Sequence, residues 1–78
     1  MIARLKNATA QDWIRSLERE GFVRRKGRGS HHVYEHPDGR RVLVVYHNLH
    51  DRFGPKTIKQ LLGATSWSEA DLRRLDLI

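Results

Sequence analysis

The chain contains no cysteine, and no apolar segment in it approaches the roughly 20 residues that a membrane-spanning helix needs. The lack of cysteine excludes disulfides and thiolate metal sites, which staple many small secreted domains. The N-terminal segment Met1-Ile2-Ala3-Arg4-Leu5-Lys6 also lacks the apolar core of a signal peptide. These absences predict a cytoplasmic protein that does not associate with a membrane.

The length limits the size of the hydrophobic core. With 78 residues, the chain buries about 60–65% of the surface that its unfolded form exposes. No internal repeat, low-complexity tract or linker interrupts it. We therefore expect a single domain over residues 1–78 with a modest core.

Positive charge is in clear excess. Lys and Arg number 15 and Asp and Glu number 9, which gives a net charge of +6. Such a balance favours binding to polyanions, although a solubilising surface has the same composition. The cations gather in two stretches, Arg24-Arg25-Lys26 with Arg28, and Arg40-Arg41.

Hydrophobic periodicity predicts the first helix over residues 9–20, while residues 1–8 have no clear period. Thr9 is a favourable N-cap and Asp12 completes a capping box. Trp13 and Leu17 share one helical face. Gly21 is the residue type that ends many helices.

Three strands should follow. Residues 22–26 form a cationic strand that ends at the break 27–29, and residues 30–36 form the second strand. The turn residues 37–39 (Pro-Asp-Gly) lead into a strand over 41–47, the most apolar run of the chain. Short turns between consecutive strands predict an antiparallel meander.

Two further helices complete the expected order. Pro55 suits the first turn of a helix over 55–62, which Gly63 should close. Ser66-Trp67-Ser68-Glu69 has the form of a capping box that opens a short last helix. We predict an α+β fold with two layers in the order α-β-β-β-α, as in double-stranded-RNA-binding domains, plus a short C-terminal helix. The helices should cover one face of the three-stranded antiparallel sheet and leave the other face open.

Histidine is abundant, at positions 31, 32, 36, 47 and 50. A metal site is not expected, because neighbouring strand residues point to opposite faces and no paired short ligand spacing occurs. We expect no cofactor. His36 precedes a proline and is interpreted as a turn residue, and His47 with Asp51 is a candidate secondary acid–base pair.

Strand parity separates the two central histidines. His32 shares a face with Tyr34, the largest side chain of the strand, so we assign that face to the helices and place His31 on the open face. An imidazole that titrates near neutral pH can move a proton during phosphodiester cleavage. The preceding turn offers backbone N–H groups, and Lys26 and Arg28 offer positive charge. The competing interpretation of His31 is an ordinary exposed polar residue.

Several segments together resemble the HicA toxin family. They are Gly29-Ser30-His31-His32-Val33-Tyr34 with His36-Pro37-Asp38-Gly39, the segment Leu17-Glu18-Arg19-Glu20-Gly21-Phe22, and the segment Gly54 to Leu62. Their order and spacing cover about residues 10–64. The stretch Val45-Tyr46-His47 departs from the family's usual proline before histidine, and the tail from Ala64 is longer than the family minimum.

The resemblance implies a fold like that of a double-stranded-RNA-binding domain. It also implies a metal-independent endoribonuclease that cleaves mRNA and is neutralised by a HicB antitoxin. The functional histidine of the family directly follows Gly-Ser, which indicates His31 here. Some relatives place it one residue later, so His32 remains an alternative.

Our hypothesis places RNA along a basic edge formed by Lys26, Arg28, Lys56 and Lys59, with Gly29 and Ser30 contributing the turn. Catalysis by His31 would use the ribose 2′-OH as nucleophile, which restricts the reaction to RNA. Two alternatives stay open. The chain could be a non-catalytic RNA-binding module, or an adaptor whose open sheet face binds a protein.

Overall fold

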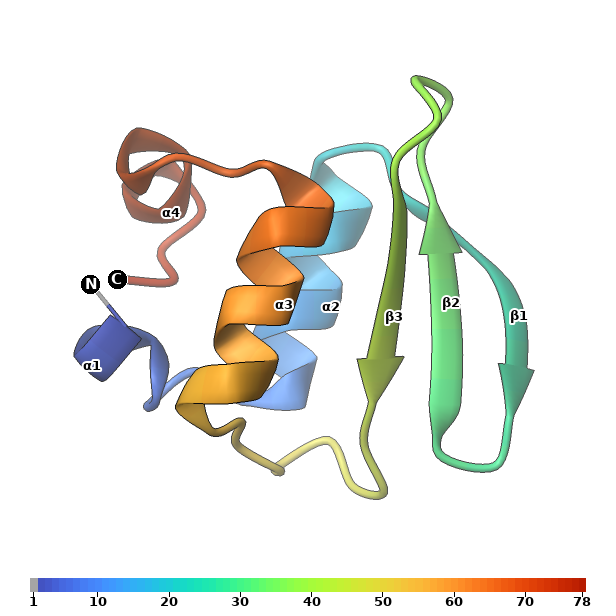
Figure 1. Cartoon of the computed structure of the whole chain (residues 1–78), viewed down its shortest axis with the longest axis horizontal. Helices are drawn as coiled ribbons and strands as arrows, with labels where there is room; N and C mark the ends of the chain where they lie inside the picture. The colour runs from blue at the N-terminus through green and yellow to red at the C-terminus, as the bar shows by residue number, and fades with distance from the viewer. Residues whose placement is uncertain (1) are drawn as a thin grey trace.

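The computed structural model describes residues 2–78, except for the side chains of Ile2, Ala3 and Lys26. A three-stranded antiparallel sheet of order β1-β2-β3 lies beside two helices that run alongside it, α2 (Ala10–Arg19) and α3 (Pro55–Thr65) (Figure 1). Two short helices, α1 (Ile2–Leu5) and α4 (Glu69–Arg74), lie beyond these helices, on the side away from the sheet (Figure 1). The predicted α+β class, the single antiparallel sheet and the short C-terminal helix are confirmed.

Helix α2 begins at the predicted cap. The Thr9 hydroxyl accepts a hydrogen bond from the Asp12 backbone N–H at 3.3 Å, and the Asp12 carboxylate accepts one from the Thr9 N–H at 2.9 Å. These reciprocal bonds satisfy two donors that a helix start otherwise leaves free. The helix ends before Gly21, whose φ of +93° is left-handed.

The three strands are β1 (Val23–Arg28), β2 (His31–Glu35) and β3 (Arg41–Val45). The prediction that β1 stops at residues 27–29 is wrong, because the strand continues to Arg28 and Gly27 pairs with His32. A Cβ at Gly27 would collide with the guanidinium of Arg24, which lies over that position. The glycine therefore makes room for a side chain within the strand and does not end it.

The two faces of the sheet differ as predicted from parity. Burial alternates along β3, where Val42 and Val44 are buried and the intervening residues are exposed. The register pairs Tyr34 with Val42 and His32 with Val44, so these four residues share the face toward the helices. The opposite face carries three exposed apolar side chains, Val23, Leu43 and Val45.

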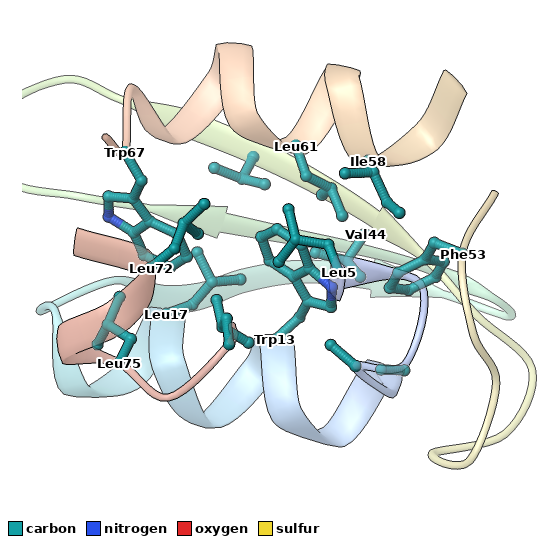
Figure 2. Close-up of a cluster of buried hydrophobic side chains, with 14 of the residues drawn as sticks. Leu5, Trp13, Leu17, Val44, Phe53, Ile58, Leu61, Trp67, Leu72 and Leu75 are labelled. Carbon is teal, nitrogen blue, oxygen red and sulfur yellow. The ribbon is translucent and has the colours of Figure 1, made fainter. Parts of the chain in front are cut away.

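Most elements contribute to the core, which extends between α2 and α3 from the sheet on one side to α1 and α4 on the other (Figure 2). Trp13 of α2 stacks on Trp67, with ring centroids 6.0 Å apart and planes inclined by 9°. The tail beyond α3 belongs to this core, because Leu72 and Leu75 are buried. The N-terminal residues, for which no periodicity is evident in the sequence, form α1 and bury Leu5.

Two predicted boundaries near the C-terminus are wrong. Helix α3 does not close at Gly63 but continues to Thr65, where Ser66 takes the left-handed conformation (φ 59°) and donates its N–H to the Leu62 carbonyl at 2.9 Å. The capping box of α4 starts at Ser68, not at Ser66, and uses Asp71. Of the two serines only Ser68 has the extended backbone of an N-cap residue.

Among residues 2–78, no helix has both the length and the apolar character needed to cross a lipid bilayer.

Candidate functional site

Three chain segments lie at the same end of the molecule. They are the turn between β1 and β2, the loop that leaves β3, and the start of α3 (Figure 1). Gly29 and Ser30 form the turn, and Gly29 has a φ of +61° that a residue with a side chain rarely adopts. The Ser30 carbonyl accepts the Tyr46 N–H at 3.0 Å, which joins the turn to the end of β3.

A hollow of about 450 Å³ opens at this junction. Its lining residues come from the turn, from β2 and from the segment after β3: Gly29, Ser30, His32, Tyr46 and His47. No acidic side chain and no Lys or Arg is among them. Two of the three predicted site residues Gly29, Ser30 and His31 therefore border the hollow, and of the two central histidines it is His32 that does so.

His32 is half-buried and held on several sides. Its ring stacks on Tyr46, with centroids 4.0 Å apart and planes inclined by 16°. Nη2 of Arg24 lies 3.3 Å from its Nδ1. Because a guanidinium only donates hydrogen bonds, Nδ1 accepts and the proton of the neutral ring is on Nε2.

The protonation of His32 follows from these contacts. Burial and, next, the charge of Arg24 lower the pKa of His32, while hydrogen bonding with the Tyr46 backbone opposes them in part. The imidazolium form is disfavoured because it loses hydration and lies beside a cation. His32 is therefore neutral near pH 7, and the lone pair on Nδ1 is already used by Arg24.

His31 has the opposite surroundings. It is exposed on the open face of the sheet, opposite Arg28 on one side and Val45 on the other in the strand register. It forms no hydrogen bond or ion pair with any side chain that the structure describes. The face predicted for each histidine is thus confirmed.

The predicted basic edge is only partly assembled around the turn. Arg28 is exposed at the end of β1 beside His31. Lys56 and Lys59 are exposed on the first turns of α3, at the same end of the molecule but outside the lining of the hollow. The backbone of Lys26 pairs with Val33, and its side chain lies outside the description.

The predicted acid–base pair between the His47 imidazole and Asp51 does not form. The Asp51 carboxylate accepts the backbone N–H groups of His47 and Asn48 at 2.9 and 3.0 Å, and these bonds lower the pKa of Asp51. The Asp51 carbonyl in turn accepts the Ala10 N–H at 2.8 Å. The carboxylate thus shapes the loop, and the loop is attached to the start of α2.

His36 lies at the opposite end of β2 and is a turn residue, as its position before Pro37 predicts. Its Nε2 bonds the Glu20 carbonyl at 2.9 Å, and its Nδ1 accepts the Asp38 N–H at 3.1 Å. The ring therefore connects the second hairpin to the end of α2.

A family model described as the HicA toxin of bacterial toxin–antitoxin systems matches residues 10–67. The chain belongs to the HicA toxin family. No curated protein matches it closely enough to serve as a relative. The family is one of toxins that act in toxin–antitoxin pairs, so this HicA chain is the toxin of such a pair and has an antitoxin partner.

The matched range contains the complete site of this HicA chain. It runs from the first residue of α2 to Trp67 and includes both central histidines, the turn and the loop after β3. Helices α1 and α4 flank it, and their buried leucines complete the core. The C-terminal tail from Ala64, which is longer than the family minimum, is therefore part of the folded domain.

Arg24 and Tyr46 are the site residues that sequence reasoning missed. In the sequence, Arg24 is one of several cations of an expected edge strand, and Tyr46 is the last residue of an apolar run. One signal was available in the sequence, since Gly27 within a strand indicates the close approach of another group. The identity of that group, the Arg24 side chain, depends on a bulge between Arg24 and Lys26.

Proposed function

We propose that this HicA toxin is a metal-independent endoribonuclease that cleaves mRNA, with His31 as its general acid and base. The observation that carries the proposal is the contrast between the two central histidines. The His31 imidazole is exposed and has no hydrogen-bond partner among the described side chains, whereas Nδ1 of His32 is engaged by Arg24. A proton carrier needs an accessible nitrogen, so His31 is better suited than its neighbour.

The proposed reaction uses the RNA itself as the nucleophile. His31 takes the proton from a ribose 2′-OH as its oxygen forms a bond to the adjacent phosphorus. The bond from phosphorus to the 5′-oxygen breaks, and that oxygen receives a proton from the imidazolium. The products are a 2′,3′-cyclic phosphate and a 5′-hydroxyl, and DNA is not a substrate because it lacks the attacking group.

Cationic and backbone groups near His31 would hold the phosphates. Arg28 is its cross-strand neighbour, and the turn at Gly29 and Ser30 presents backbone to the same place. Lys56 and Lys59 are exposed on α3, on the helix side of the sheet, so they would contact the RNA farther from His31. Contacts of this kind position the backbone without reading sequence, and they weaken as salt rises.

The decisive experiment is cleavage of an unstructured RNA by purified protein in EDTA, comparing wild type, His31→Ala and His32→Ala. General acid–base catalysis by one group contributes about 10²–10⁴-fold, so His31→Ala should lose a factor of this size. His50→Ala is the matched control, because His50 is an exposed loop histidine outside the hollow. Intact RNA at high protein concentration would refute the nuclease and leave an RNA-binding module. Full activity of His31→Ala, with loss in His32→Ala, would move the role to His32.

We further propose that the antitoxin partner is of the HicB type. A partner bound on the open sheet face would cover His31 together with the exposed apolar residues Val23, Leu43 and Val45. Exposed apolar side chains on one sheet face are typical of interaction surfaces. Co-expression with a HicB protein encoded beside this chain should abolish growth arrest, and persistent arrest would contradict the pairing.

A further inference from the structure

The stacked pair of His32 and Tyr46 forms one wall of the hollow beside the turn. Both rings are half-buried, nearly parallel and 4.0 Å apart. The two rings are therefore stacked face to face. Two planar rings held in one orientation form a flat surface that another planar ring can extend.

The polarity of the hollow indicates which kind of group it accepts. Among the side chains that the structure describes, no Lys or Arg lines it, so these residues are poorly suited to hold a phosphate. It contains no carboxylate either, so it does not repel an approaching polyanion. The Ser30 hydroxyl and the His47 imidazole provide polar groups at the margin of an otherwise aromatic surface.

Arg24 keeps the His32 ring in place for this role. Its guanidinium lies over Gly27 and reaches Nδ1 of His32 at 3.3 Å. A glycine at position 27 is required for that approach, because any Cβ would displace the guanidinium. The ring is thus oriented before a ligand arrives, which reduces the cost of binding.

The hollow is large enough for a planar ring system. About 450 Å³ is at the lower end of the roughly 300–1,000 Å³ that ligand pockets span. This volume is sufficient for one base. Unpaired bases that stack on aromatic side chains are the usual means by which proteins bind single-stranded RNA.

We propose that this hollow binds one unpaired nucleobase of RNA, which stacks on the His32–Tyr46 pair. The proposal rests on the proposed ribonuclease function and adds a binding subsite to it. His31 and His32 are on opposite faces of β2 beside the turn, so an RNA strand with a base beside His32 would reach His31 by passing around the turn. The substrate is then single-stranded RNA, with Tyr46 as the residue that positions it.

The test uses two hexanucleotide probes of equal charge whose riboses carry 2′-O-methyl groups, which prevents cleavage. One probe has abasic sites throughout, and the other has a single base, with A, C, G and U tried in turn. Binding is measured by fluorescence anisotropy. The wild type should prefer a one-base probe by about 5- to 150-fold, the range that base stacking on an aromatic residue supplies.

Variants connect this preference to the stacked pair. Tyr46→Leu should bind both probes equally, whereas Tyr46→Phe, which keeps the ring, should retain the preference. The measured quantity is the ratio of the affinities for the two probes within one variant. A general loss of stability lowers both affinities and leaves this ratio unchanged. His32→Leu gives a second removal of the stack if Tyr46→Leu does not fold. Glu69→Gln, at an exposed position of α4 on the side away from the sheet, is the control and should leave the ratio unchanged.

Equal affinity of the wild type for the abasic and one-base probes would overturn the base subsite, and so would a preference that survives both Tyr46→Leu and His32→Leu. These outcomes are separate from the nuclease assay. A chain that prefers the one-base probe but leaves RNA intact would refute the ribonuclease and retain the subsite. A chain that cleaves RNA without any base preference would do the reverse.

Discussion

The imidazoles of His31 and His32 are on opposite faces of β2, and among the described side chains one, that of Arg24, hydrogen-bonds His32 while none bonds His31. Arg24 lies 3.3 Å from Nδ1 of His32 and Tyr46 stacks on its ring, while His31 is exposed between Arg28 and Val45 in the register. One histidine therefore helps to form a hollow, and its neighbour remains available for proton exchange. The predictions below test this division and the packing that supports it.

Replacing Arg24 should change the titration of His32. In Arg24→Gln the nearby cation is gone, so the pKa of His32 should rise toward the ordinary value of an imidazole, although burial still lowers it. A pH titration of the histidine ring signals by NMR measures the change, with the His50 signal as reference. An unchanged or lower pKa for His32 would show that Arg24 does not act on it.

The lowered pKa of His32 also predicts a pH dependence of stability. His32 binds a proton less readily in the folded chain than in the unfolded chain, where its pKa is about 6.5. The contribution of neutral His32 to the free energy of unfolding is complete above about pH 6.5. It is lost as the pH falls through the lower pKa that His32 has in the folded chain. The free energy of unfolding should decrease between about pH 7 and pH 5, above the range where the carboxylates titrate.

Chemical denaturation at several pH values checks this effect. His32→Gln should have a flatter profile than the wild type over the same interval, because the titrating group is absent. His50→Gln serves as the matched control. Parallel profiles for the wild type and His32→Gln would contradict the prediction.

Two glycines should respond oppositely to alanine. Gly63 lies inside α3 with open space where a Cβ would be, so Gly63→Ala should stabilise the fold by about 0.5–1 kcal/mol. Gly29 also has open space, but its φ is +61°, so Gly29→Ala should destabilise by about 1–2 kcal/mol. Thermal unfolding measures both, and changes of the same sign would show that backbone conformation is not the deciding factor.

The C-terminal tail should be essential for stability. Leu72 of α4 is fully buried, and Leu72→Ala should cost about 2–5 kcal/mol through lost burial and the cavity that remains. Leu49→Ala, at a loop position that is 44% exposed, is the matched control and should have a small effect. A loss below about 1 kcal/mol for Leu72→Ala would mean that α4 is not part of the cooperative unit.

Local patterns in the sequence were sufficient for part of this description. The capping box of Thr9 and Asp12 located the start of α2, and the period of two along a strand assigned His31 and His32 to different faces. The order of elements then implied helices on one face of a meander. These features depend on residues a few positions apart, so the chain by itself determines them.

The tertiary structure decided the rest of the site. The hollow exists because Tyr46, from the end of β3, packs on His32 of β2, and because Arg24 reaches across Gly27 from β1. No spacing along the chain reveals which ring lies over which, since that depends on strand register and on a bulge. Spacing along the chain also does not reveal the role of α4, because its leucines are part of the core only through contacts with residues distant in sequence. The sequence determined which residues could serve the site, and three-dimensional packing determined which of them meet.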